Sequence, residues 1–239
     1  CQEHGAEEPV DDREAAMYAN YFDSEAICAQ RAMDSVLRNQ EKRISALVFN
    51  TTTWTGAALT TTVGVAWSTF ATAVPIDNVL AARRKVWDGT GIWPNAIIMT
   101  AKKFQDLQQT TQLIDRVKYS GFYDPLQKGL GVNEISRALG LDFVFIAGSA
   151  KDSAKEGQAR TVASIWTDTL AMVCKVAVSN DIREPCIGRT FHWGADGSQI
   201  GGLVESYRDE PVRADIIRVR HDVQEKILYK ECGHLLQGL

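Results

Sequence analysis

Histidine and cysteine side chains are common ligands of transition-metal ions, and this chain contains both. The four histidines, His4, His192, His221 and His234, are far apart in the sequence, and none belongs to an HExxH or CxxC pattern. Cys232 and His234 are two positions apart, so in an extended strand both would point to the same side and could share a zinc ion. Because no second pair of ligands accompanies them, we predict no metal-binding residue.

Motifs for nucleophilic catalysis and phosphate binding are also absent from the sequence. It has neither a G-x-S-x-G elbow nor a Walker-type glycine loop. The segments Gly194-Ala195-Asp196-Gly197 and Gly201-Gly202 lack the Lys and the Ser or Thr of a phosphate loop, and are typical of flexible turns. Adjacent carboxylates such as Asp209 and Glu210 do not point together into one cleft, as acid–base catalysis would need. We predict no catalytic residue, no cofactor-binding residue and no cofactor.

The composition is that of a folded chain with an acidic balance. Its 239 residues are 45% hydrophobic and 23% charged, which suits one large domain or two small ones. The formal net charge of −4 argues against the basic surface that nucleic-acid readers use. No apolar run approaches about 18 residues, and no charged leader precedes an apolar stretch, so we expect no membrane partner.

The cysteines and the first residue bear on the compartment. Five cysteines, an odd number scattered without pattern, favour a reducing cytosol over a disulfide-stapled secreted domain. Because the sequence starts at Cys1 and not at methionine, we expect that residues upstream are missing from it. A mature bacterial lipoprotein also starts at cysteine; a lipidated Cys1 would carry a large added mass, which mass spectrometry would detect.

The strongest local pattern is that of a long amphipathic helix. No Gly or Pro occurs between Asp12 and Gly56, and Asp11 and Asp12 suit the positive end of a helix dipole. We predict a continuous helix from about Asp12 to Val48, roughly 50 Å long at about 1.5 Å per residue. The apolar residues recur at steps of three and four: Tyr18, Phe22, Ala26, Ala29, Met33, Val36, Leu37, Ile44 and Leu47. The charged residues on the opposite face either contact solvent or meet neighbouring subunits.

Beyond this helix, helical and strand patterns alternate. The Thr-rich residues 50–62 are interpreted as an irregular or β segment. Pro75 precedes a predicted helix over residues 76–87, which the turn Gly89-Thr90-Gly91 ends. Ala96-Ile97-Ile98-Met99 is typical of a buried strand, and Thr100 of the cap of a following helix.

The second half of the chain continues this alternation. It runs through residues 113–119, for which no element type is predicted, to a Gly and Pro loop at 121–131, a helix at 133–139 ended by Gly140, and an apolar strand at 141–147. We then predict a loop at 149–160, strands at 164–166 and 170–178 joined by a turn at 167–169, polar turns at 194–202, and a pair of strands at 216–220 and 227–229. We find no internal repeat, low-complexity tract or interdomain linker. The predicted fold class is α+β.

Several segments follow one another in an order that can be compared with known families. Glu3 to Asp12 leads into the long helix, Trp93-Pro94-Asn95-Ala96-Ile97-Ile98-Met99 precedes another helix, and Asp115 to Tyr119 and Ser153 to Gly157 come later. Near the end, the stretch 215–220 is followed by 226–229. This order, along nearly the whole chain, resembles that of the major capsid proteins of tailed phages, which share the Hong Kong ninety-seven phage fold.

The resemblance implies an assignment of parts. Residues 1–74 would be the first part of a peripheral domain with its spine helix at 12–48, residues 75–184 a mixed α/β axial domain at the centre of each hexamer or pentamer, and residues 185–239 the rest of the peripheral domain with its extended sheet. Such subunits carry an amino-terminal arm and an extended hairpin loop before the spine helix, whereas about ten residues precede it here. Because the cross-linking lysine of some members lies in that loop, no cross-link residue is predicted.

The implied function is that of a major capsid protein, which self-assembles through hexamers and pentamers into the icosahedral shell that encloses phage DNA. The implied location is the virion, with assembly in the host cytoplasm. The implied partners are copies of the chain itself, scaffolding, portal and decoration proteins, and double-stranded DNA packaged without sequence-specific binding. Charges along residues 31–43 and 208–220 would form intersubunit ion pairs, each contributing about 0–1 kcal/mol where exposed.

Three alternatives stay open at this point, one of which is the lipoprotein that a lipidated Cys1 would indicate. An encapsulin-like nanocompartment shell has the same fold and would hold an enzyme cargo. A soluble α/β enzyme would be a discrete monomer with a deep polar pocket.

Overall fold

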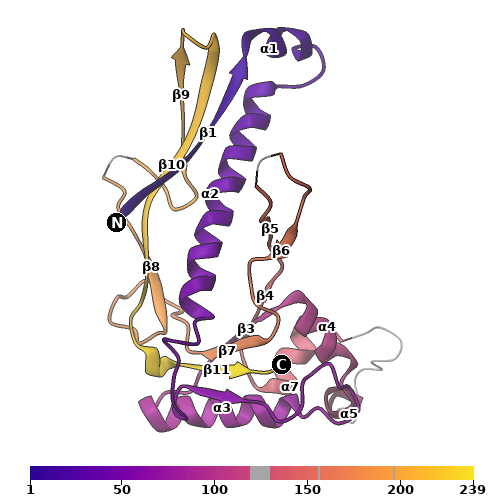
Figure 1. The fold of residues 1–239 in the computed structure, drawn as a ribbon. Coiled ribbons are helices and arrows are strands. Elements are labelled where there is room, and N and C mark those ends of the chain that lie inside the picture. The colour runs from indigo at the N-terminus through magenta and orange to yellow at the C-terminus, as the bar shows by residue number, and fades with distance from the viewer. Residues whose placement is uncertain (119–129, 156, 196) are drawn as a thin grey trace. The chain divides into compact units, whose positions relative to one another are not determined.

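The computed structural model describes residues 1–118, 130–155, 157–195 and 197–239, which form two compact units. The first unit contains Cys1–Ile44 and Thr190–Lys226, and the second contains Ser45–Arg189 and Ile227–Leu239. Helices and sheets are present in the α+β arrangement that the sequence predicts (Figure 1). In the described ranges, no helix is both long enough and apolar enough to cross a membrane.

The first unit is an antiparallel sheet packed against a long helix (Figure 1). Its elements are β1 (Gln2–Asp11), α1 (Asp12–Tyr18), α2 (Ser24–Val48), β8 (Gly188–His192), β9 (Leu203–Asp209) and β10 (Ala214–Ile227). Strand β10 is central, pairing with β1 along residues 214–223 and with β9 along 214–220. Val219 of β10 packs on Ala32 and Val36 of α2, with Ala6 of β1 beside them. The last residues of α2 and β10 and the first residues of β8 belong to the second unit.

The predicted continuous helix at residues 12–48 is wrong in its first third. Helix α1 ends at Tyr18, and α2 begins at Ser24. The carboxylate of Asp23 accepts hydrogen bonds from the backbone N–H groups of Glu25 and Ala26, at 3.1 and 3.2 Å. An aspartate in this position caps a new helix by satisfying N–H groups that have no partner inside the helix. The interruption therefore has a local cause, although neither Gly nor Pro is present.

Removal of the Asp23 carboxylate tests this cap. We expect Asp23→Ala to lower the free energy of unfolding by about 0.5–2 kcal/mol, because two N–H groups at the start of α2 lose their acceptor. Asp23→Asn keeps an acceptor oxygen and should cost much less. Urea denaturation of the two variants and the unaltered chain measures both losses; equal losses would contradict the capping role.

Strand β10 replaces the pair of strands predicted at residues 216–220 and 227–229, and that prediction is wrong. Both segments lie in or directly after one strand of 14 residues. The charged residues between the two segments lie inside this strand, and two of them, Asp222 and Glu225, are buried. Its partner β1 lies in residues 2–11, where no strand was predicted.

The second unit is a five-stranded sheet in the order β2-β11-β7-β3-β4, with a separate hairpin of β5 and β6. Its elements are β2 (Thr60–Thr62), α3 (Pro75–Thr90), β3 (Ala96–Thr100), α4 (Ala101–Gln109), α5 (Thr111–Lys118), α7 (Val132–Leu139), β4 (Phe143–Ala147), β5 (Ala150–Asp152), β6 (Val162–Ser164), β7 (Leu170–Cys174), the 3-10 helix η1 (Lys230–Cys232) and β11 (Gly233–Gln237). β2 is parallel to β11 and β3 is parallel to β4, whereas β7 is antiparallel to both of its neighbours.

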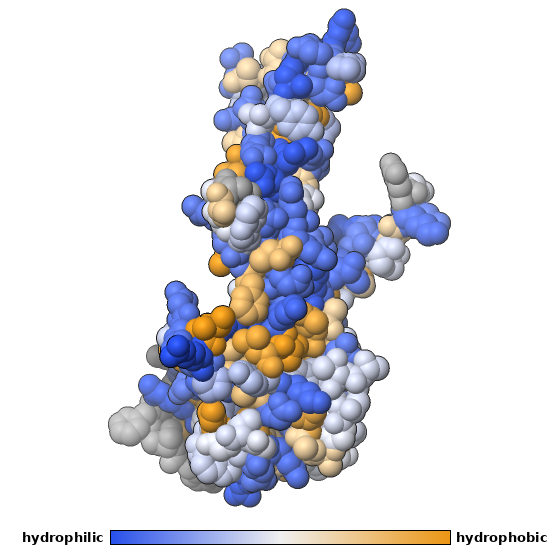
Figure 2. All heavy atoms as spheres, turned by 90° about the vertical axis from the view of Figure 1, so that its left-hand side faces the viewer, coloured by the Kyte–Doolittle hydropathy of each residue, from blue (hydrophilic) through white to orange (hydrophobic). Residues whose placement is uncertain are grey.

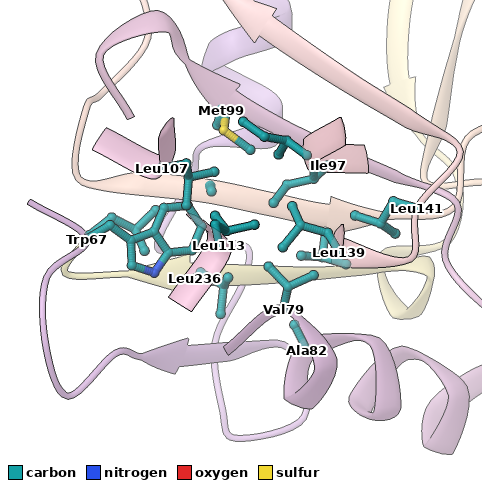
Figure 3. Close-up of a cluster of buried hydrophobic side chains, with 14 of the residues drawn as sticks. Trp67, Val79, Ala82, Ile97, Met99, Leu107, Leu113, Leu139, Leu141 and Leu236 are labelled. Carbon is teal, nitrogen blue, oxygen red and sulfur yellow. The ribbon is translucent and has the colours of Figure 1, made fainter. Parts of the chain in front are cut away.

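The core of the second unit lies between this sheet and its helices (Figure 3). Ile97 of β3 and Leu236 of β11 meet Val79 of α3, Leu107 of α4 and Leu139 of α7. All five side chains are buried. Since burying one such side chain contributes about 1.5–3 kcal/mol, this apolar layer is the main source of the unit's stability.

The helix and strand predictions around residues 75–109 are confirmed with small changes of boundary. The helix predicted at 76–87 is α3, which includes Gly89 and ends before Gly91, whose φ of +69° is left-handed. The strand predicted at 96–99 is β3. Thr100 caps α4 as predicted, with its hydroxyl accepting from the backbone N–H of Lys103 at 3.4 Å.

The helix predicted at 133–139 is confirmed as α7. Residues 113–118, for which the sequence gave no element type, lie in helix α5. Gly140 follows α7 with a φ of +68°, as a helix-ending glycine should. The loop predicted at 121–131 lies outside the described residues except for its last two positions.

Two strand and loop predictions in the second unit need correction, whereas the strand predicted at 141–147 is confirmed as β4. The loop predicted at 149–160 contains β5 and the turn of a hairpin, closed by the Asp152 carboxylate, which accepts from the N–H groups of Ala154 and Thr161. The strands predicted at 164–166 and 170–178 correspond to β6 and β7, which belong to different sheets. The apolar strand β4 lies at a sheet edge, where Phe143 and Phe145 are 39% and 45% exposed.

Candidate intersubunit surfaces

The histidines considered as metal ligands have other surroundings. His4 and His221 face each other across β1 and β10, with ring centroids 6.0 Å apart. Burial and the charge of Arg43 lower the pKa of His4, which favours its neutral form. Because no strand was predicted at residues 2–11, the sequence did not indicate that His4 and His221 lie close together. Among the described residues, no three His, Cys, Asp or Glu side chains form a group that could hold a metal ion.

Cys232 and His234 do not share one strand face, because Cys232 lies in η1 and His234 in β11. Both ring nitrogens of His234 have partners: Nδ1 lies 2.9 Å from the carbonyl oxygen of Ala58, and Nε2 lies 2.9 Å from the hydroxyl of Thr61. Burial lowers the pKa of His234. The imidazole therefore links β11 to the segment around β2, which is a structural role.

The cysteines are all free thiols, and three of them are buried in the second unit. Cys174, Cys186 and Cys232 lie near the end of the five-stranded sheet, where β7 meets β11. Burial raises the pKa of Cys174 to about 12, so its sulfur is a thiol and not a thiolate at neutral pH. A buried neutral thiol is neither a nucleophile nor an anionic metal ligand.

The glycines at residues 194–202 serve turns and close packing. Gly197 and Gly202 have φ values of +83° and +108°, which favour glycine. A side chain at Gly202 would also approach Cγ1 of Val219 to 2.8 Å. Asp196 lies outside the described residues. For the described glycines of this segment, the backbone geometry supports the predicted turns and gives no indication of phosphate binding.

Several charges predicted to pair between subunits are paired within the chain, which corrects that expectation. Arg43 forms a two-pronged ion pair with Glu225, at 2.9 and 3.1 Å. Burial would raise the pKa of Glu225, but the hydrogen bonds from Arg43 outweigh it and lower the pKa. Arg218 pairs with Glu7 at 2.6 Å and Arg220 with Glu205 at 2.9 Å. The sequence could not indicate these partners, because they come from remote segments.

A second group of charges joins α1 to the turn between β9 and β10. Arg208 pairs with Asp12 at 2.6 Å and with Asp215 at 3.3 Å. The backbone N–H of Asp12 also donates to the carbonyl oxygen of Arg213 at 3.4 Å. A depression of about 310 Å³ lies beside them, lined by Glu25, Ser206, Tyr207, Arg208, Asp215 and Ile217. Its single arginine is engaged in ion pairs, so the depression offers no unpaired cation for an anionic ligand.

Glu184 closes a loop of the second unit. Its carboxylate accepts from the backbone N–H groups of Val178 and Ser179, at 3.0 and 2.8 Å, and from the Ser179 hydroxyl at 2.7 Å. These hydrogen bonds lower the pKa of Glu184 to about 2, and Lys175, 3.5 Å away, acts in the same direction.

The lowered pKa of Glu184 predicts a pH-dependent contribution to stability. Because the folded pKa lies below the unfolded one, the contribution is complete above about pH 4.5 and is lost as the pH falls towards about 2. We expect Glu184→Gln to be less stable than the unaltered chain at neutral pH, with the difference shrinking through that acidic range. Denaturation midpoints of both chains at several pH values measure this; a difference independent of pH would contradict it.

Several large apolar side chains are exposed on the surfaces of both units. In Figure 2, hydrophobic side chains, in orange, gather in patches surrounded by hydrophilic surface. In the second unit, Trp87 and Trp93 are stacked at 5.0 Å, with the guanidinium of Arg83 over Trp93. In the first unit, Met17 and Tyr21 are exposed in and just after α1. Exposed apolar patches with polar rims are typical of protein–protein contacts.

A depression of about 250 Å³ lies between α3 and the segment before β2, lined by Ala57, Ala58, Leu59, Lys85, Asp88, Gly89 and Glu231. Its lysine and carboxylates surround a mainly apolar floor of small side chains. No described histidine, cysteine, serine or threonine lines it.

No family model and no curated protein matches the sequence. Solved structures, however, match it along nearly its whole length. A phage-related protein from Bordetella bronchiseptica is 18% identical with a TM-score of 0.73, over 99% of this chain and 75% of that one. The capsid protein of Myoviridae phage XM1 is 9% identical with a TM-score of 0.60, over 100% and 73%. The SrpI encapsulin of Synechococcus elongatus is 9% identical with a TM-score of 0.51, over 100% and 74%.

These likenesses establish the fold. The chain has the phage major capsid fold, as the resemblance in its sequence implied. At these identities, the likeness concerns architecture and not residue roles.

Proposed function

We propose that this chain is a major capsid protein, which assembles through hexamers and pentamers into an icosahedral shell enclosing phage DNA. The observation that carries the proposal is the match of nearly the whole chain to a phage capsid protein and to a phage-related protein. The exposed apolar side chains of both units support it, because a subunit that tiles a shell needs contact surface on several sides. The proposed role is structural and not catalytic.

The proposed parts follow from the same likeness. The first unit, which contains most of the spine helix α2, would be the peripheral domain, and the second unit the axial domain. The resemblance placed residues 1–74 and 185–239 in the peripheral domain and 75–184 in the axial domain, whereas residues 45–74, 185–189 and 227–239 belong to the second unit. The proposed partners are copies of the chain, scaffolding, portal and decoration proteins, and packaged double-stranded DNA, which an acidic chain would enclose without sequence-specific binding. The proposed location is the virion, after assembly in the host cytoplasm.

An encapsulin-like shell is the second candidate, favoured by the match to an encapsulin over the whole chain. The two candidates differ in what the shell encloses. Particles isolated from the natural source would contain DNA if the chain is a phage capsid protein, and a protein cargo if it is an encapsulin.

Negative-stain microscopy with analytical ultracentrifugation tests the shell function itself. We expect the purified chain to form capsomer-sized rings or closed polyhedral particles. A single species of about 26 kDa at all concentrations would overturn the proposal. Chain variants with a disrupted core serve as the control that assembly requires the folded state.

A further inference from the structure

The two units carry opposite formal charges. The first unit has 17 acidic and 10 basic residues, a charge of −7, and the second has 13 acidic and 16 basic residues, a charge of +3. Together they give the −4 of the chain. In a shell made of one kind of subunit, such segregation allows attraction between unlike units of neighbouring copies.

The negative charge of the first unit is concentrated around α1. We define the acidic end as residues 11–25 and 208–215, which hold eight carboxylates and three arginines. The two segments are in contact through the ion pair of Arg208 with Asp12 and the hydrogen bond from Asp12 to Arg213. Helix α1 has no buried residue. Met17 is 67% exposed and Tyr21 83% exposed, so apolar groups lie among the carboxylates.

The hairpin of β5 and β6 is an exposed segment of the second unit. Both strands pair only with each other among the described elements, and every residue of β5 is exposed. The hairpin carries Lys151 and Lys155, for which the described residues provide no ion-pair partner, and Arg160. Val162 is 58% exposed beside them. A two-stranded hairpin is marginally stable in water unless something packs against it.

We propose, resting on the shell function above, that the acidic end of one copy docks on the β5–β6 hairpin of the next copy. The carboxylates of the acidic end meet Lys151, Lys155 and Arg160, and the apolar side chains of α1 cover Val162. The contact joins two different surfaces, so it repeats from copy to copy, as the contacts of a ring do. It also supplies the packing that both segments lack within the chain.

Charge reversal on both sides tests the pairing. The hairpin variant carries Lys151→Glu and Lys155→Glu, and the acidic-end variant carries Glu14→Lys and Glu210→Lys; none of these residues caps a helix. For each variant alone, we expect the protein concentration at which assembly begins to rise about tenfold or more, because like charges then face each other. A chain that carries all four reversals should assemble as the unaltered chain does, because in hexamers and pentamers alike each reversed surface then meets its reversed partner.

Matched controls separate this contact from net charge. Lys118→Glu with Lys230→Glu makes the same change of charge elsewhere in the second unit, and should leave assembly within about twofold of the unaltered chain. Circular dichroism verifies that each variant is folded. If a reversed variant does not fold, Glu14→Gln with Glu210→Gln takes its place, and a weaker form of the same defect is expected.

Chemical cross-linking gives a second, independent readout. A carbodiimide joins lysines directly to carboxylates that touch them, and mixing isotope-labelled with unlabelled chain identifies links between copies. We expect links from Lys151 or Lys155 to carboxylates of the acidic end in the assembled fraction.

The outcomes distinguish the two proposals. If the unaltered chain assembles, the docking contact alone is overturned by any of three results: no effect of either reversal, an equal effect of the control, or no rescue in the chain that carries all four reversals. Absence of any assembly of the unaltered chain overturns both the contact and the shell function.

Discussion

Arg43→Met is expected to lower the free energy of unfolding by about 3–5 kcal/mol. The substitution leaves the carboxylate of Glu225 buried without a cation, since Glu225 is 7% exposed and its two oxygens accept from Nε and Nη2 of Arg43. A buried charge that loses its partner keeps its desolvation cost and loses the attraction that offset it. Chemical denaturation in urea or guanidinium measures the loss.

A double variant distinguishes this explanation from simple loss of packing by the arginine stem. Arg43→Met with Glu225→Leu removes both charges and keeps apolar volume, so we expect it to recover most of the lost stability. If the double variant is as unstable as Arg43→Met, the unpaired carboxylate is not the cause. The prediction would then be contradicted.

The second large effect is expected at Trp67, in the core of the second unit. Its side chain is fully buried and lies in the apolar layer with Leu107 and Leu236 (Figure 3). We expect Trp67→Ala to lower the free energy of unfolding by about 3–5 kcal/mol, because the lost transfer energy adds to the cost of the cavity. Thermal and chemical denaturation, followed by far-ultraviolet circular dichroism, measure it.

Trp67→Phe is the matched control for the cavity. The phenyl ring fills much of the same space, and the substitution removes an indole N–H that has no hydrogen-bond partner among the described residues. Because a buried donor without a partner is itself destabilising, Trp67→Phe should lose much less stability than Trp67→Ala. Similar losses in the two variants would show that the indole makes a specific contact that a smaller ring cannot replace.

That the chain has no catalytic residue stays a prediction from motif spacing, which is a local property. The surfaces that we propose as intersubunit contacts could not be predicted from such local patterns. The charges at residues 31–43 and 208–220 suggested ion pairs between subunits, whereas Arg43, Arg218 and Arg220 have partners within the chain. The β5–β6 hairpin was missed because Asp152 closes its turn across nine residues.

Local patterns in the sequence determined the elements whose causes are local. The buried strand β3, the cap at Thr100 and the helix ends at Gly91 and Gly140 depend on residues within a few positions, so propensity and periodicity could predict them. The order of these elements was enough to indicate a capsid fold.

Only the tertiary structure decided which distant segments pair. Strand β1 forms because residues 214–223 provide its partner, and β10 runs through a charged segment because Arg43 neutralises Glu225 inside it. The physical reason is that strand pairing and buried ion pairs take their free energy from groups remote in sequence, which no local pattern contains.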